Sequence, residues 1–542
     1  MPNRLFNMPA TLDRRQWLAR AAQCAAMGSL PRWAWSNTAL LQHNPFSLGV
    51  ASGDPLSDGF VIWTRLMPVP GSAAHPASLP DIPWMGAQTV RWEVAEDESF
   101  RRISASGAAS ADPSFAHSVH VEVGGLQPGR WYFYRFMHGD AVSPIGRTRT
   151  APAPGEMPQR LRVVYASCQR WEHGFYCAWR HACADQPDLV LFLGDYIYEY
   201  ASPAHPEGLA RVHTLPLPRS LEDYRARYAL HKSDPALQAA HAVAPWVVTW
   251  DDHEVQNDYT GNYGRDGMTA DLLLMRTAAW QAFYEHMPLR ASSLRHDGFH
   301  SLQLFRRIQW GRLARFHVLD ARQYRDRQAC RKPGSSSAAA VHPDKCPELL
   351  DPARSFLGYE QESWLTQGIA DDAASRAFRW SVVAQQTLFS PRHYPSGTRS
   401  TDSWDGYPAA RDRLIRAIDR TPPRNTVFLG GDIHQNYVCN IEAVNARAVD
   451  GKSSRVIASE FCGTSITSRS GTTQAKVDAV RRINPHVLLA RCEERGYGLC
   501  DITPQRWRAT LRAITDPLDP QSAAYDLAGF TVEDRRAGPQ PG

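Results

Sequence analysis

The chain has 542 residues, which is too long for one compact hydrophobic core and predicts two or three structural units. Hydrophobic residues make up 43% of the sequence and charged residues 21%, a profile that excludes an intrinsically disordered chain. The formal net charge is only +5 and no run of five or more basic residues occurs, so nucleic acid is not expected as a specific partner.

The first segment, residues 1–36, has the pattern of an export signal. Arg14 and Arg15 precede a weakly apolar stretch at 19–30, an arrangement that resembles a signal read by the twin-arginine export machinery. An amphipathic first helix with a chance arginine pair is the alternative. Because Arg20 interrupts the apolar stretch and no other stretch reaches ~18 apolar residues, we expect a periplasmic or secreted protein without stable membrane insertion.

The ten cysteines fit an oxidising compartment. Cys24 would leave with the signal, and Cys168 is treated below as a candidate metal ligand. Cys330 and Cys346 flank a loop rich in Gly, Ser and Ala, and we expect a disulfide that closes this loop. The other cysteines available for disulfides, with their connectivity left open, are Cys177, Cys183, Cys439, Cys462, Cys492 and Cys500.

Residues 43–152 are expected to form a β-sandwich of the fibronectin or immunoglobulin type. The pattern Leu126-x-Pro128-x-x-x-Tyr132 resembles a tyrosine corner, in which the tyrosine hydroxyl ties a loop to the sheet. Residues 151–155, rich in proline and alanine, predict a stiff linker. The alternating segments that predict strands are 59–64, 90–94, 119–123 and 131–136.

From residue 158 to residue 530 the pattern changes to apolar runs that alternate with helical segments. This alternation predicts a layered α/β core of the αββα type. Helices are expected at 221–230, 235–241 and 271–286, where they would cover the core and shape a pocket, and a β-hairpin is expected at 499–514.

Four apolar runs of this core end in side chains that can bind metal ions. A buried strand cannot hold a carboxylate or an imidazole in its middle without a partner, so ligands collect just past strand ends, where neighbouring strands can converge on one crevice. A metal ion is the simplest agent that makes such a cluster stable. The four runs with their motifs are 161–166 with Ser167-Cys168-Gln169, 189–193 with residues 194–198, 245–250 with residues 251–254, and 426–429 with residues 430–434.

The motif at 194–198 offers two ligands, Asp195 and Tyr198. The two oxygens of Asp195 can bridge two cations, and Tyr198 follows about one turn later. A phenolate ligand favours a hard trivalent ion, above all ferric iron. A Gly-Asp turn with two packing tyrosines is the alternative.

The motif at 251–254 carries Asp252 as a candidate ligand. His253 would bind substrate or act as an acid near the leaving oxygen. Because these acidic residues follow an apolar strand, they need ions or hydrogen bonds to balance them. An exposed charged turn is the alternative.

The last two candidate motifs are less specific. Asp432 and His434 lie two positions apart, on the same side of an extended segment, and a glycine-rich turn with a solvent-facing histidine is the alternative. Cys168 alone would usually be a buried small hydrophobe, but it stands at the same predicted strand edge, where a trivalent ion would deprotonate it.

Taken in order, these motifs resemble the PhoD-like alkaline phosphatase/phosphodiesterase family of the metallophosphatases. Segments 319–325, 404–408 and 460–468 resemble that family's later motifs, and the signal and the sandwich agree, so the similarity spans nearly the whole chain. The resemblance implies a metallophosphatase core that holds one ferric ion, Fe3+, and calcium, Ca2+.

The resemblance also implies which residues bind the ions. Cys168 and Tyr198 would bind the iron, Asp195 would bridge iron and calcium, and Asp252 would bind calcium; the division of the remaining two between the ions is open. The full ligand set is Cys168, Asp195, Tyr198, Asp252, Asp432 and His434.

One motif departs from the wider group of binuclear metallophosphatases, which has Val-x-x-His before its last ligands. The comparable run here, 381–387, contains no histidine, so Gln386 is at best a weak oxygen contact. The second ion then sees mainly oxygen ligands, which suit calcium better than zinc.

The expected activity is hydrolysis of a phosphate ester to inorganic phosphate by a hydroxide generated at the metals. His253 and Arg322 or Arg325 would offset charge on the ester, and direct attack is favoured because no Ser or Thr stands in a nucleophile motif. The alternatives are a phosphodiesterase or phospholipase D-like activity at the same site, and a non-catalytic surface-binding protein with a structural metal site. The sequence leaves the choice between small monoester and diester substrates open.

Overall fold

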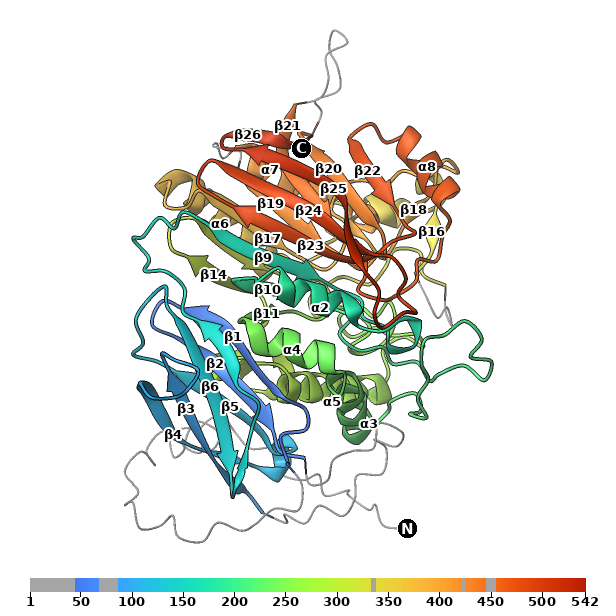
Figure 1. Cartoon of the computed structure of the whole chain (residues 1–542). Helices are drawn as coiled ribbons and strands as arrows, with labels where there is room; N and C mark the ends of the chain where they lie inside the picture. The colour runs from blue at the N-terminus through green and yellow to red at the C-terminus, as the bar shows by residue number, and fades with distance from the viewer. Residues whose placement is uncertain (1–43, 68–85, 333–337, 421–424, 445–454) are drawn as a thin grey trace, which may run out of the picture.

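The computed structural model describes residues 44–67, 86–332, 338–420, 425–444 and 455–542 (Figure 1). The expected export signal at 1–36 and Cys24 lie outside the described residues. Among the helices that are described, none combines the length and the apolar character needed to cross a membrane.

Three consecutive strands of the core pair in parallel within a ten-stranded sheet. In the first pair Leu191 lies opposite Tyr165, and in the second Leu191 lies opposite Val247, so the segments after all three strands leave from one edge. The strand order is β26 (Arg536–Pro541), β25 (Ala524–Glu533), β24 (Arg506–Ile514), β23 (Arg495–Ile502), β9 (Leu161–Ala166), β10 (Leu189–Phe192), β11 (Trp246–Val248), β1 (Val50–Leu56), β2 (Gly59–Arg65) and β5 (Ser118–Val123).

A second sheet of seven strands faces the first. Its strands β15, β17, β19 and β21 are parallel neighbours, so their carboxyl ends also share one edge. The order is β14 (Arg306–Trp310), β15 (Ala314–Val318), β17 (Trp380–Ala384), β19 (Thr426–Gly430), β21 (Val456–Cys462), β20 (Asn436–Glu442) and β22 (Val487–Arg491).

The two sheets pack through apolar side chains that alternate along each strand. Val163 of β9 joins the cluster between the sheets together with Val427 of β19, whereas Val164 faces the helices on the other side. Burial on both faces explains why these strands read as continuous apolar runs.

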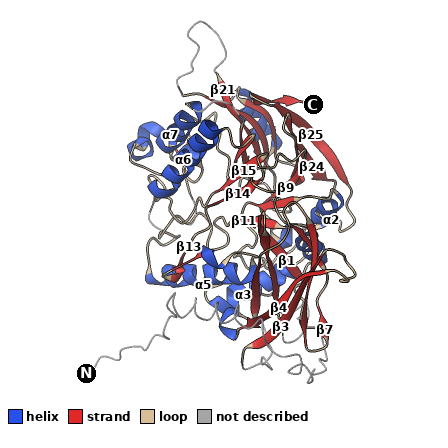
Figure 2. Ribbon diagram, turned by 90° about the vertical axis from the view of Figure 1, so that its left-hand side faces the viewer, coloured by secondary structure: helices blue, strands red, loops and turns tan. Residues whose placement is uncertain are grey.

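Helices cover the outer face of each sheet (Figure 2). Trp179 and Phe283 pack against the first sheet, and Leu365 and Leu414 pack against the second. The helices on the first sheet are α2 (Cys177–Ala184), α3 (Leu221–Lys232), α4 (Pro235–Val243) and α5 (Ala270–His286), those on the second are α6 (Tyr359–Ser375) and α7 (Pro408–Asp419), and α8 (Gln474–Arg482) packs on β22.

The three helices expected at 221–230, 235–241 and 271–286 are present, and local signals explain where two of them begin. Ser220 and Asp223 form a reciprocal capping box at the start of α3, with the Asp223 N–H 3.2 Å from the serine hydroxyl oxygen. The Asp234 carboxylate caps α4 directly before Pro235, which needs no hydrogen-bond partner there. The hairpin expected at 499–514 is β23 and β24.

Three of the N-terminal strands are hydrogen-bonded into the core sheet. β1 pairs with β11 through Gly53 and Trp246, so β1, β2 and β5 extend the ten-stranded core sheet. Apolar residues of these strands share one cluster with a five-stranded sheet. The contact expected of a tyrosine corner is present, with the Gln127 N–H 3.0 Å from the Tyr132 hydroxyl. The five strands are β3 (Gln88–Ala95), β4 (Ile103–Ala111), β6 (Trp131–His138), β7 (Ala141–Val142) and β8 (Gly146–Arg149).

Two short ladders complete the described strands. β12 (Leu294–Arg295) pairs with β13 (Gly298–Leu302), and β16 (Ala340–Val341) pairs with β18 (Arg399–Ser400).

The disulfide expected from the sequence, between Cys330 and Cys346, is present in the structure. Their Cα atoms lie 6.0 Å apart. The sequence left further bridges open, and within the described residues six of the other cysteines form none; they lie buried or half-buried in the fold and pack as small apolar side chains. These six are Cys177, Cys183, Cys439, Cys462, Cys492 and Cys500.

Candidate metal centre

The six predicted ligand side chains lie together, but they come from both sheets. Cys168 follows β9, Asp195 and Tyr198 follow β10, and Asp252 follows β11, all in the ten-stranded sheet. Asp432 and His434 follow β19 of the facing sheet. The centre therefore lies where the carboxyl edges of two packed sheets meet, whereas the sequence had suggested neighbouring strands of one crevice.

The chain reaches this geometry by unusual backbone turns. Cys168, Asp195, Asp432 and His434 all have positive φ angles, of 60°, 58°, 63° and 54°. Residues with side chains rarely adopt this conformation, and it occurs where surrounding structure enforces it, most often at functional sites. Each turn redirects the chain directly after a strand, so that the side chain faces the centre.

Two glycines allow the loops to approach one another closely. A Cβ atom on Gly194, whose φ is 108°, would lie 2.5 Å from the Asp251 side chain. A Cβ atom on Gly431 would lie 2.1 Å from the Ser167 hydroxyl. Neither site has room for a larger residue, so these glycines serve loop packing around the centre.

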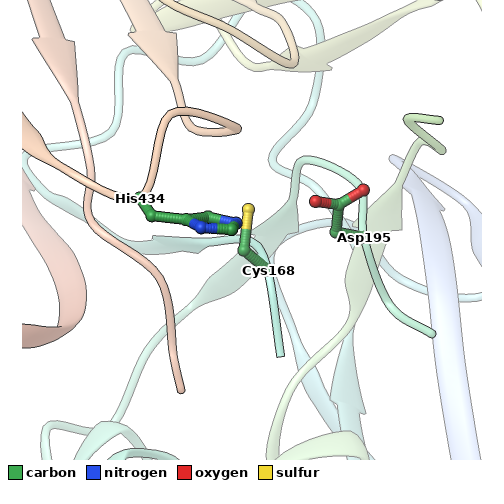
Figure 3. Close-up of side chains that lie close together, drawn as sticks. All are labelled: Cys168, Asp195 and His434. Atoms are coloured by element: carbon green, nitrogen blue, oxygen red, sulfur yellow. The ribbon is translucent and has the colours of Figure 1, made fainter. Parts of the chain in front are cut away.

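The first group of donors combines sulfur, nitrogen and oxygen. Cys168, Asp195 and His434 each offer a ligand atom, and these atoms lie within 4.8 Å of one another (Figure 3). The Tyr198 hydroxyl joins them, 2.9 Å from Asp195 Oδ2 and 3.0 Å from His434 Nε2. The Ser468 hydroxyl lies 2.8 Å from the Tyr198 oxygen.

The second group of donors is made of carboxylates. Ligand atoms of Asp251, Asp252 and Asp432 also lie within 4.8 Å of one another, and Asp252 adjoins Asp195 in a further group with His253. The two groups are therefore continuous through Asp195 and Asp252.

Burial makes these acids costly to ionise without cations. It raises the pKa of Asp195 and of the Cys168 thiol well above their usual values, and raises the pKa of Asp432 to about 6 and of Asp258 to about 7. Bound cations reverse this effect because they stabilise the deprotonated ligands. A dense set of buried acidic donors of this kind fits metal ions.

Arg322 compensates part of this charge. Its guanidinium has no exposed surface and lies 2.5 Å from an Asp251 oxygen and 2.8 Å from an Asp402 oxygen. Burial opposes ionisation of Asp252, but Arg322, His253 and backbone hydrogen bonds together outweigh burial and lower the pKa of Asp252. Arg325 likewise donates to Asp402, at 3.0 Å.

His253 is held in place by Glu199. Its Nδ1 lies 2.7 Å from a Glu199 oxygen, and the second oxygen of Glu199 accepts the Asn257 N–H at 2.9 Å. The His253 ring lies 4.1 Å from the Tyr198 ring, centroid to centroid. Burial lowers the pKa of His253, but the negative charges of Glu199, Asp252 and Asp195 together raise it by more, so the net shift is upward.

Sequence reasoning assigned no role to several residues of the centre. Glu254 accepts the N–H groups of Asp251 at 2.8 Å and Tyr196 at 2.6 Å, which joins the loops after β10 and β11. Glu199 and Glu254 directly adjoin predicted site residues in the sequence, so their position in these motifs could have indicated a role at the centre. Ser468 ends segment 460–468, which was also singled out, whereas Asp402 carried no local signal of its role because its partner Arg322 lies 80 positions away.

Gln386 does not point its amide hydrogens at the ligands. The amide nitrogen donates to Thr249, to the Trp250 carbonyl and to the Leu319 carbonyl at 2.8 to 2.9 Å. Its side-chain oxygen is buried and makes no hydrogen bond within the described residues.

Comparison with models of known protein families shows which family this chain belongs to. A family model described as PhoD-like phosphatase matches residues 163–511, and one described as PhoD-like phosphatase, N-terminal domain, matches residues 32–152. The chain belongs to the PhoD-like phosphatase family. This PhoD-like chain is accordingly an enzyme that hydrolyses phosphoric ester bonds, and the family resemblance of its motifs is confirmed.

Individual proteins similar to this chain support the same family assignment. Alkaline phosphatase D of Bacillus subtilis (strain 168) is 40% identical over 548 residues, which cover 97% of this chain and 89% of the relative. A solved structure of PhoD superposes with a TM-score of 0.83, at 41% identity and 93% coverage of both chains. The purple acid phosphatase PPD1 from yellow lupin (Lupinus luteus) seeds shares the fold, with a TM-score of 0.51 at 12% identity over 90% of this chain and 73% of that one.

Proposed function

We propose that this PhoD-like phosphatase is an exported, metal-dependent phosphoesterase of the alkaline phosphatase type that releases inorganic phosphate from small phosphate esters. In this proposal residues 43–152 form a β-sandwich and residues 158–530 an αββα metallophosphatase core. The observation that carries it is the continuity, through Asp195 and Asp252, of a mixed donor group with an all-carboxylate group.

The donor chemistry supports one ferric ion beside calcium. Cys168, Tyr198 and His434 supply sulfur, phenol and imidazole, which suit iron, and Asp195 would bridge. Carboxylate oxygens of Asp252 and its neighbours suit calcium. When bound, such cations supply Lewis acidity toward the phosphoryl oxygens and lower the pKa of water.

The protein's own side chains would orient the ester and manage protons. Glu199 occupies Nδ1 of His253, which leaves Nε2 to donate a proton to the leaving oxygen. Thr387 and Ser468 hydroxyls are engaged with Asp432 and Tyr198, so we propose water as the nucleophile. Arg322 and Arg325 would offset charge on the ester indirectly. They neutralise carboxylates beside the centre and so reduce the negative charge that the ester meets there.

The decisive experiment combines metal content with turnover. We expect the purified protein to contain iron and calcium by elemental analysis and to hydrolyse p-nitrophenyl phosphate. Asp195→Asn should lose metal and lower kcat by at least about 100-fold, since even residues behind the ligands commonly contribute 10- to 100-fold. Asp526→Asn, an exposed carboxylate on β25, serves as the matched control.

Three outcomes carry different conclusions. A fully active, metal-free protein would overturn the metal-dependent proposal. A metal-replete protein without turnover would instead support a structural metal site. The ratio of rates on p-nitrophenyl phosphate and bis-p-nitrophenyl phosphate separates monoester from diester preference.

Export is proposed from residues 1–36. Replacing both Arg14 and Arg15 by Lys should leave the precursor in the cytoplasm, and mature secreted protein should begin near Asn37. Secreted protein that still begins at Met1 would contradict export through this signal.

A further inference from the structure

Basic side chains lie beside the metal centre, outside the ligand set. Arg170 follows Cys168 by two positions, and its guanidinium lies 4.9 Å from the Tyr200 ring centroid and 5.9 Å from that of Tyr198. The Tyr200 ring lies 5.3 Å from the His253 ring. Arg170 thus reaches the aromatic wall against which His253 packs.

Arg469 approaches the same side from a different segment. Its backbone carbonyl lies 2.9 Å from Nδ1 of the candidate ligand His434, and its N–H donates to Nδ1 of His173 at 3.1 Å. These backbone contacts fix where the exposed side chain begins. The guanidinium donates a hydrogen bond to the peptide carbonyl of Gly208.

His173 lies between the two arginines. Its backbone N–H donates to the Arg170 carbonyl at 3.3 Å, and burial together with the charges of Arg170 and Arg469 lowers its pKa to about 4. His173 is therefore neutral, and because Nδ1 accepts the Arg469 N–H, its Nε2 carries the hydrogen.

The positive charge on this side is only partly compensated. Arg170 pairs with Glu172 at 3.3 Å, but Glu172 is buried and shared with His213 at 3.2 Å. Within the described part of the chain, no carboxylate lies within the 4.0 Å of an ion pair to Arg469. The exposed Arg469 thus presents a positive charge to solvent, on a segment whose backbone contacts the candidate ligand His434.

We propose that Arg170 and Arg469, with His173 between them, form an anion subsite for the leaving group. The preferred substrates are phosphate esters whose leaving group carries a second negative charge, a carboxylate or a phosphate. This inference rests on the proposed phosphoesterase function. Arginine suits the role because its planar fork binds both anions through two parallel hydrogen bonds. The subsite adjoins His253, the proposed proton donor to the leaving oxygen.

The test compares esters that differ in charge but have similar leaving groups. We would measure kcat/KM for 4-carboxyphenyl phosphate and for its methyl ester, and for 1,4-phenylene bisphosphate against phenyl phosphate. The first pair tests a carboxylate as the second anion, and the other pair tests a phosphate. Wild-type enzyme should favour at least one charged ester by about 10-fold or more, as expected for a charge-assisted contact.

Variants locate the effect. Arg469→Gln should reduce the charged-to-uncharged ratio of kcat/KM by about 10-fold, Arg469→Lys should retain part of it, and the preference should weaken in high salt. Arg170→Gln, combined with Arg469→Gln, should bring the ratio close to one. Arg482→Gln, an exposed arginine on α8, is the control that changes net charge equally without changing the ratio.

Failure of the subsite is distinguishable from failure of the function. A wild-type ratio near one for both pairs, or a preference that survives in the double variant, overturns the subsite while ester hydrolysis continues. If the wild-type enzyme hydrolyses none of the four esters, the phosphoesterase function itself fails.

Discussion

The hydroxyl of Tyr198 lies 3.0 Å from Nε2 of His434, although 236 positions separate these residues in the chain. Tyr198 follows β10 of the ten-stranded sheet, and His434 follows β19 of the facing sheet. The centre is complete only when the two sheets have packed, so metal binding and the tertiary fold are expected to stabilise each other.

The Tyr198–His434 contact leads to a spectroscopic prediction. A phenolate on ferric iron absorbs in the visible region, so the purified enzyme should be coloured and should bleach with dithionite. Tyr198→Phe keeps the ring that packs against His253 and removes only the oxygen, so the band should disappear with little change in the urea midpoint. Tyr132→Phe, the matched control, should keep the band but lose about 1 kcal/mol of stability with the corner hydrogen bond. An unchanged band in Tyr198→Phe would exclude the phenolate ligand.

The carboxylate group predicts a preference among added metals. Strong chelation should abolish hydrolysis of p-nitrophenyl phosphate and lower the unfolding midpoint, because Asp251, Asp252 and Asp432 then crowd a buried site without a cation. Calcium should restore activity better than magnesium or zinc, since it accepts many oxygen ligands in flexible geometry. Restoration by zinc alone would indicate a di-zinc enzyme.

The Glu199–His253 pair predicts a dependence on the leaving group. Glu199→Gln removes the charge that orients His253, so kcat should fall by about 10- to 100-fold with a small change in KM. Because a proton donor matters most for poor leaving groups, the loss should be greater with phenyl phosphate than with p-nitrophenyl phosphate. Equal losses on both substrates would remove proton donation from the role of His253. Glu222→Gln, an exposed position in the first turn of α3, is the control.

Lys232 predicts a pH dependence of stability away from the centre. Its ammonium lies 4.2 Å from the Trp63 ring centroid, and burial lowers its pKa from 10.5 to about 7. Between these two values the unfolded chain binds one proton more than the folded chain, so this group makes the free energy of unfolding rise with pH. Below about pH 7 both states are protonated and the full penalty of burying the charge remains.

Lys232→Met removes this penalty. The variant should be more stable than wild type near pH 6.5, by an amount on the order of a few kcal/mol that the contact with Trp63 reduces. The advantage should shrink by pH 9.5, as measured by urea unfolding at both pH values. Lys476→Met, at an exposed position of α8, should show no such trend. A stability difference independent of pH would show that Lys232 keeps its charge in the fold.

Features that depend on a few adjacent residues could be predicted from the sequence. The strand at 161–166 matches β9, and α4 begins at Pro235 behind its capping Asp234, because strand and cap signals act over one or two turns of chain. The Cys330–Cys346 disulfide closes a loop of 16 positions and was likewise expected. The motifs named the ligand-type residues because buried strands exclude such side chains from their middles.

What the tertiary structure alone decided are contacts between distant segments. Arg322 meets Asp402 across 80 positions, and β1 joins the core sheet through Gly53 and Trp246. No local pattern encodes these pairings, because they depend on which sheet edges and loops meet when the apolar faces are buried. The sequence by itself determined which residues can bind metal and where each strand delivers them. Only the packing of two sheets decided that Tyr198 and His434 share one centre, because hydrophobic burial sets the distance between segments that local propensities leave independent.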